Sequence, residues 1–275
     1  MEERFYLPDI NRLSVLSATI LLGYALTRFV AIPSRSAILG IFGIQITLQV
    51  DFKTAVSLIV ALLAAVGSDW LLRGHPSQAN KKSKWGKNLQ HWFLPALTAW
   101  VIGVPLNNLA GGTGWWIVFG MGGILLVLVF MAEYSVANPT EVRFPAASLG
   151  LTGLSFGLYL LLAIALQSAG SRLYLLLPAL VLAAGLVSLR TFYLRLKGQW
   201  LLNWVGGIAV IVGQLTIGLH YLPLTPVRFG LLLLGPTYAL TSFAVLRGEK
   251  KSWQEMFAEP LVMLVLVWGL AIWLQ

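Results

Sequence analysis

The stretch Trp115–Met131 (WWIVFGMGGILLVLVFM) contains no charged side chain, and its only polar side-chain groups are two indole N–H groups. About 20 apolar residues in an α-helix span the roughly 30 Å hydrocarbon core of a bilayer, and such a helix satisfies its backbone hydrogen bonds internally. Runs of similar length and composition recur between Leu13 and Leu274, and most charged residues lie between them. The sequence therefore predicts an all-α fold, a polytopic transmembrane helical bundle.

The apolar runs predict about nine spans, which we expect to form a single integral membrane domain over residues 1–275. The expected spans are Leu13–Ile32, Thr54–Leu72, Trp92–Leu109, Trp115–Met131, Pro145–Gln167, Leu173–Leu189, Trp200–His220, Phe229–Leu246 and Pro260–Leu274.

The composition leaves no room for a sizeable soluble domain. Hydrophobic residues make up 58% of the chain and charged residues 11%, whereas charged residues are about 25% of a typical soluble domain. The net charge is +9, but the basic residues are spread among short segments and not gathered on one polar face. We therefore expect the lipid bilayer, and no nucleic acid, as a partner.

The distribution of Lys and Arg predicts the orientation of the chain. When the segments between spans are assigned alternately to the two sides of the membrane, most of the 19 Lys and Arg residues fall on one side, and Gly74–Gln90 is the richest segment. Cytoplasmic loops are enriched in Lys and Arg. The pattern therefore predicts that the N-terminus and Gly74–Gln90 are cytoplasmic and that the C-terminus is external.

The segment Ile44–Val50 (IQITLQV) alternates apolar and polar residues between the first two spans. A period of two predicts an extended strand, and irregular backbone is not tolerated facing lipid. One hypothesis makes this strand a lid over an external cavity. The alternative is a covering connector without a functional role.

Ionisable residues are expected at the cytoplasmic ends of spans, and none deep inside a span. Asp69 and Arg73 are four residues apart, a spacing that suits an ion pair on one helix face. One hypothesis gathers five residues into a cytoplasmic polar cluster that binds a ligand or a membrane-protein partner, and the alternative is interfacial anchoring. The five residues are Asp69, Arg73, Glu133, Arg190 and Glu259.

Two spans contain residues that interrupt helices. Asn107 and Asn108 end the third span, and in the eighth span Gly235 and Pro236 precede Thr237 and Tyr238. Broken membrane helices expose carbonyl groups that must line protein or a water-filled cavity. These six residues suggest a polar cavity that opens toward the outer face. The alternative is an ordinary proline kink.

The sequence contains few residues that could take part in catalysis or bind a metal ion or cofactor. The chain has no Cys, and its three histidines, His75, His91 and His220, do not share a helix face at metal-ligand spacing. A G-x-S-x-G elbow, a P-loop and paired aspartate motifs are absent from the sequence. We therefore assign no catalytic, metal-binding or cofactor-binding residue, and we expect no cofactor.

Three short motifs carry a resemblance. The runs Gly67–Pro76 (GSDWLLRGHP), Met131–Ser135 (MAEYS) and Glu255–Pro260 (EMFAEP) resemble an uncharacterised family of bacterial multi-pass membrane proteins defined only by a domain of unknown function. The resemblance would extend over most of the chain. It implies a helical bundle in the bacterial inner membrane, and it supplies no activity, ligand or catalytic residue.

Three classes of function remain open. The lack of buried charge and of chemical motifs favours a non-enzymatic scaffold or accessory component of a membrane assembly. The interrupted spans favour a carrier or channel for a neutral or apolar solute. The polar residues expected at the inner face favour a membrane enzyme that acts on a lipid-linked substrate.

Overall fold

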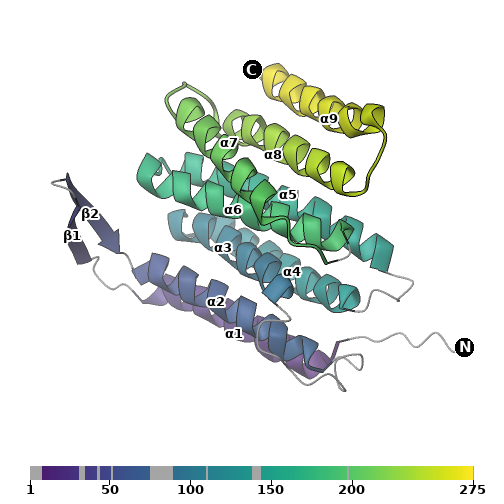
Figure 1. The fold of residues 1–275 in the computed structure, drawn as a ribbon. Helices are drawn as coiled ribbons and strands as arrows, with labels where there is room; N and C mark the ends of the chain where they lie inside the picture. The colour runs from purple at the N-terminus through teal and green to yellow at the C-terminus, as the bar shows by residue number, and fades with distance from the viewer. Residues whose placement is uncertain are drawn as a thin grey trace, which may run out of the picture. The chain divides into compact units, whose positions relative to one another are not determined.

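The structure is a computed structural model, and it describes residues 8–30, 35–41, 44–50, 52–74, 89–109, 111–137, 144–196 and 198–274. This part of the chain contains nine helices that are long and apolar enough to cross a membrane, which confirms the all-α bundle (Figure 1). The helices are α1 (Ile10–Phe29), α2 (Phe52–Leu72), α3 (Phe93–Asn108), α4 (Thr113–Val136), α5 (Phe144–Ser168), α6 (Leu173–Arg195), α7 (Leu202–His220), α8 (Pro226–Gly248) and α9 (Trp253–Trp273).

The chain divides into two compact units, Met1–Ala137 and Asn138–Gln275. The first unit contains α1 to α4, and the second contains α5 to α9. The single domain expected over the whole chain stays a prediction. Most of the basic segment expected to be cytoplasmic, residues 75–88, lies outside the described residues.

The expected extended segment is confirmed as strand β2 (Ile44–Val50). It pairs with β1 (Arg35–Ile41) in an antiparallel hairpin whose register runs from Arg35 opposite Val50 to Ile41 opposite Ile44. The sequence did not predict β1, because its apolar residues are consecutive and do not alternate. Figure 1 shows the hairpin beside the start of α2. A role as a lid stays a prediction.

Three helices extend beyond the predicted spans at charged residues. Helix α4 continues past Met131 to Val136, and α6 continues past Leu189 to Arg195. Helix α9 begins at Trp253, where Ser252 and Glu255 form a capping box. The predicted spans stop at these charges because the apolar run ends there, whereas helical backbone hydrogen bonding continues through a charged residue.

Helices α1 to α4 of the first unit pack around one core, in which Ile20, Tyr24 and Leu126 are buried. Small residues bring the backbones close together, as is usual in membrane bundles. A Cβ at Gly67 would lie 2.1 Å from Leu16, and one at Gly23 would lie 2.7 Å from Val60. The Tyr24 hydroxyl donates to the carbonyl of Ala99 and so joins α1 to α3.

Helix α8 is the centre of the second unit and contacts α5, α6, α7 and α9. Its contacts with α9 run in opposite directions along the two helices, because Arg228 donates to the Ala271 carbonyl whereas Tyr238 donates to Glu259. The two helices are therefore antiparallel. Helix α7 lies along α6 and α8 and has much of its surface exposed.

Candidate functional site

The five residues of the expected polar cluster are divided between the two units. Asp69, Arg73 and Glu133 belong to the first unit, and Arg190 and Glu259 belong to the second. A single cluster of all five therefore stays a prediction. Within its own unit, each residue has a different environment.

Asp69 and Arg73 form the ion pair that their spacing predicts at the end of α2. The Nη2 atom of Arg73 lies 2.7 Å from Oδ2 of Asp69, and its Nε donates to the same oxygen at 2.9 Å. The Arg73 side chain is largely exposed. Ion pairs with one largely exposed partner contribute about 0–1 kcal/mol to stability, so this pair contributes little to holding the end of α2.

Glu133, which was expected at the end of a span, forms a buried pair with His91. The Nδ1 atom of His91 lies 2.6 Å from Oε2 of Glu133, and the two side chains are 4% and 2% exposed. The pair joins the 3-10 helix η2 (Leu89–His91), which precedes α3, to the last turn of α4. Sequence analysis missed this contact because the residues are 42 positions apart and no motif relates them.

Side chains contact both ring nitrogens of His91. The amide nitrogen of Gln90 lies 3.1 Å from Nε2 of His91, and Nδ1 faces the Glu133 carboxylate; the tautomer with its hydrogen on Nδ1 satisfies both contacts. Ser68 donates to the main-chain oxygen of His91 at 3.0 Å and to that of Ala65 at 2.7 Å. The Ser68 hydroxyl is therefore not directed at the imidazole, and the three side chains do not form a nucleophile–base–acid relay.

Glu259 lies within α9, six residues after the first residue of the helix and directly before the predicted start of the ninth span. Its Oε1 atom accepts hydrogen bonds from the Tyr238 hydroxyl and the Ser242 hydroxyl, both at 3.0 Å. Tyr238 and Ser242 are one turn apart on α8, so both reach the same carboxylate. Glu259 therefore fastens α9 to α8.

Arg190 is also buried, with 1% of its surface exposed, five residues before the end of α6. Glu133 and His91 are buried as well; the sequence predicted that Arg190 and Glu133 lie near span ends, but it did not predict their burial. Two positions earlier on the same helix, the Ser188 hydroxyl lies 2.9 Å from that of Thr241 on α8. Buried ionisable groups in membrane helices are candidates for function.

The expected interruption at Gly235 and Pro236 does not break α8, which is continuous from Pro226 to Gly248. Proline lacks an N–H group, so the carbonyl of Leu232 loses its helical donor. The indole Nε1 of Trp268 on α9 donates to this carbonyl at 3.2 Å. A Cβ at Gly235 would lie 2.9 Å from Cδ1 of Trp268. The glycine and the proline therefore accommodate one tryptophan of the next helix.

The other residues of the expected polar cavity also make local contacts. Thr237 is buried and donates to the Leu233 carbonyl at 2.7 Å. Asn107 donates to the Ser57 hydroxyl at 2.9 Å and thereby joins α3 to α2, whereas Asn108 is exposed. Asn107 and Asn108 belong to the first unit and residues 235–238 to the second, so a cavity that they share stays a prediction.

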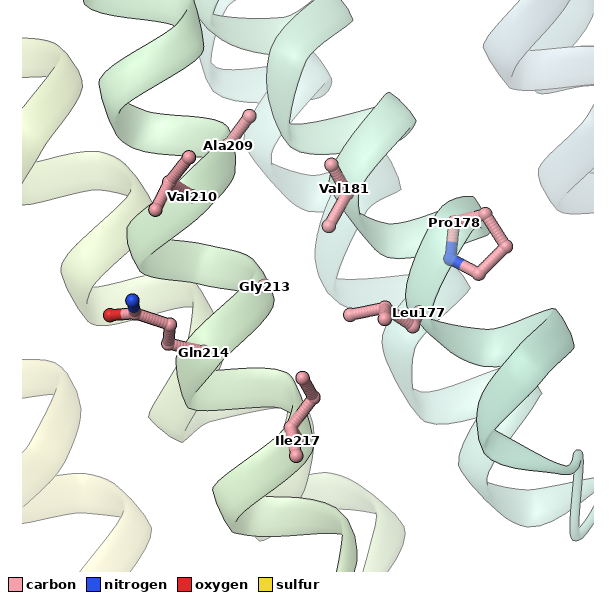
Figure 2. Close-up of a pocket in the computed structure, with 8 residues that line it drawn as sticks. All are labelled: Leu177, Pro178, Val181, Ala209, Val210, Gly213, Gln214 and Ile217. Atoms are coloured by element: carbon pink, nitrogen blue, oxygen red, sulfur yellow. The ribbon is translucent and has the colours of Figure 1, made fainter.

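A groove that sequence analysis did not single out lies between α6 and α7, with a volume of about 400 Å³ (Figure 2). It is open and apolar except for Gln214, whose amide points away from α6. The residues that line it are Leu177, Pro178, Val181, Ala209, Val210, Gly213, Gln214 and Ile217.

Gln214 is exposed in the middle of an otherwise apolar stretch of α7. None of the described residues hydrogen-bonds to its amide. Transfer of an unpaired amide from water into hydrocarbon costs about 4–8 kcal/mol. The exposed face of α7 beside the groove is therefore poorly suited to lipid alone, and the groove itself is too apolar for a polar solute.

Metal ligands do not converge in the described part of the chain, where no group of three or more His, Cys, Asp or Glu residues could hold an ion. The expected absence of metals and cofactors stays a prediction for the whole protein. His91 and Glu133 could supply two ligands only, and each already contacts the other.

Residues 32–274 match the family model described as "Protein of unknown function (DUF5656)". The match covers most of the chain, so the chain belongs to this family, and the expected membership of an uncharacterised family is confirmed. No curated protein and no solved structure matches the chain. Together with the nine candidate spans, the match describes an integral membrane protein of undetermined activity.

Proposed function

We propose that this member of the DUF5656 family is a non-enzymatic scaffold or accessory component of a membrane assembly. The observation that carries the proposal is the unpaired amide of Gln214 beside the α6–α7 groove. Polar side chains in membrane helices are commonly satisfied by hydrogen bonds to neighbouring helices. A membrane-protein partner on this face would supply the missing hydrogen bonds.

The sequence argument for a carrier is weaker once the contacts of α8 are considered. The carbonyl that Pro236 frees is occupied by Trp268, and Tyr238 is bound to Glu259. These groups hold two helices together and leave no interrupted helix end for a solute. The scaffold hypothesis does not depend on such an end.

Crosslinking in native membranes tests the proposal. A photoreactive amino acid in place of Val210, which is 59% exposed on α7, should yield a protein adduct of defined mass. The adduct should decrease in the Gln214→Leu variant. As a matched control, the same probe at Leu266, 60% exposed on α9, should yield lipid adducts only. Lipid adducts alone at position 210 would contradict the proposal.

A second candidate function, a membrane enzyme that acts on a lipid-linked substrate, is favoured by the buried His91–Glu133 pair. A histidine held by a carboxylate suits general acid–base catalysis. His91→Gln and Glu133→Gln keep a polar group at each position, so they should abolish turnover without unfolding the protein if the pair is catalytic. Lipid-extract assays that detect no difference between these variants and the wild type would dismiss this candidate.

We place the protein in the bacterial inner membrane, with the N-terminus cytoplasmic and the C-terminus external. The charges of the second unit support this orientation. Arg195 lies 3.3 Å from Glu249, so the ends of α6 and α8 are on the same side, together with Arg247, Lys250 and Lys251. Helix α9 is antiparallel to α8 and ends on the other side.

The chain has no native cysteine, so single cysteines test the orientation directly. In intact cells, Leu274→Cys should react with an impermeant thiol reagent, and Ser252→Cys should react only after the cells are opened. Ser83→Cys, which lies outside the described residues, should behave like Ser252→Cys. The reverse pattern would overturn the assigned orientation.

A further inference from the structure

We propose that the exposed face of α7 binds the same face of a second copy of this chain, and that the two copies form a parallel two-fold dimer in the membrane. The face comprises Asn203, Gly207, Val210, Gln214 and Ile217, all exposed in the protomer. This inference rests on the proposed function, because it names the partner that the scaffold binds.

The depth of Gln214 makes a partner necessary. Helix α7 has 19 residues, so at about 1.5 Å per residue it is about 28 Å long and barely spans the hydrocarbon core. Gln214 is six residues from the last residue, His220, and so lies about 9 Å inside that end. The amide is therefore surrounded by hydrocarbon in the isolated protomer, where lipid chains offer no hydrogen bond.

A second copy is the partner that supplies an amide at the required depth. All copies of the chain enter the membrane with the same orientation, so a two-fold axis along the membrane normal places each residue opposite itself. Gln214 then faces Gln214 of the other copy. A primary amide is both a donor and an acceptor, so the two side chains can form a reciprocal pair.

The spacing of the face fits two parallel helices. The positions 203, 207, 210, 214 and 217 alternate steps of four and three, which is the pattern of a left-handed coiled-coil contact. At the centre of such a contact, one polar amide specifies register and oligomeric state. Asn203 adds a second amide near the start of the helix.

The small residues on this face of α7 allow a second helix to approach closely. A Cβ at Gly207 would meet no atom within 4 Å, and the same holds for the flanking Gly206 and Gly218. Small residues of this kind let two membrane helices pack backbone to backbone. Beside them, the α6–α7 groove provides about 400 Å³ for aliphatic side chains of the second copy, and Val210 and Ile217 form its α7 side (Figure 2).

Cysteine crosslinking of the full-length protein in native membranes tests the dimer. Val210→Cys, the only cysteine in the chain, should form a covalent dimer of twice the 30.1 kDa protomer mass under mild oxidation. Leu266→Cys on α9 is the matched control and should remain monomeric. Single-molecule photobleaching of the wild-type protein at low density should show two steps per spot.

Two further variants separate the dimer contact from folding. Gly207→Leu fills space that is open in the protomer, so it should leave the fold intact and reduce the dimer fraction at least tenfold. Gly269→Leu, at an equally open glycine of α9, should leave the dimer fraction unchanged. Gln214→Leu should raise the dimer dissociation constant about three- to tenfold, as expected for one interhelical amide pair.

The outcomes distinguish this inference from the proposed function. A covalent dimer that Gly207→Leu and Gln214→Leu weaken supports both. A Gln214-dependent photoadduct at position 210 with a different protein keeps the scaffold function and overturns the dimer. A single photobleaching step, together with lipid adducts alone at position 210, overturns both.

Discussion

In the contact between α8 and α9, polar groups meet partners on the other helix, whereas on the exposed face of α7 the Gln214 amide meets none among the residues that the structure describes. The Leu232 carbonyl is bound by Trp268, and the Glu259 carboxylate accepts two hydroxyl hydrogen bonds. Both regions belong to the same unit and the same kind of helix. The difference is that the α8–α9 contact is made within the chain, whereas Gln214 has no hydrogen-bond partner among the described residues, as expected of a face that binds another molecule.

The largest effect on stability is expected from the buried His91–Glu133 pair of the first unit. It tests whether this pair, like the α8–α9 contacts, holds the fold together. Glu133→Ala leaves His91 without its carboxylate, and breaking a buried pair costs about 3–5 kcal/mol. We expect a loss of this size in the free energy of unfolding in mild detergent. Arg73→Ala, which breaks the pair of the largely exposed Arg73 with Asp69, should lose less than about 1 kcal/mol. If Glu133→Ala leaves the free energy of unfolding unchanged, the His91–Glu133 pair does not stabilise the fold in the way proposed for the α8–α9 contacts.

The next largest effect on stability is expected at Gly235, in the α8–α9 contact, compared with Gly207, on the exposed face of α7. Gly235→Leu forces side-chain atoms against Trp268, and such overpacking costs about 1–3 kcal/mol of stability. Gly207→Leu points into open space and should change the stability of the monomer by less than about 0.5 kcal/mol. Unfolding measurements on diluted, monomeric protein compare the two. Equal losses would mean that the α7 face is packed within the protomer.

A double-mutant cycle measures the hydrogen bond between Trp268 and the Leu232 carbonyl. Pro236→Ala restores an N–H group that can bind this carbonyl within α8, so we expect this variant to be tolerated. Trp268→Phe removes the indole donor and should cost about 1 kcal/mol more in the wild-type background than in the Pro236→Ala background. Equal costs in both backgrounds would show that the indole contributes packing alone.

The smallest effect concerns Gln214 itself. Because Gln214 has no partner among the described residues, Gln214→Leu should change the stability of the monomer by less than about 0.5 kcal/mol. Thermal unfolding at high dilution measures this. A larger destabilisation would show that the amide is satisfied within its own chain, and the contrast with α8 and α9 would then disappear.

Much of the fold could be predicted because hydrophobic length and period act locally. The uncharged run Trp115–Met131 predicts a span, and the alternation in Ile44–Val50 predicts a strand. The pairing of His91 with Glu133 could not be predicted, because it depends on two helix ends that meet in space. Gln214 gave no signal either, because a lone amide matters only once the exposed face of its helix is known.

The contacts of α9 have a consequence for synthesis of the protein. Helix α9 leaves the ribosome after α8, and it is held mainly through α8. Until it arrives, the Leu232 carbonyl has no donor, and Tyr238 and Ser242 have no carboxylate to bind. These polar groups of α8 therefore remain unpaired until α9 has been inserted. A nascent chain arrested before Trp253 should be retained by the insertion machinery or degraded by membrane proteases.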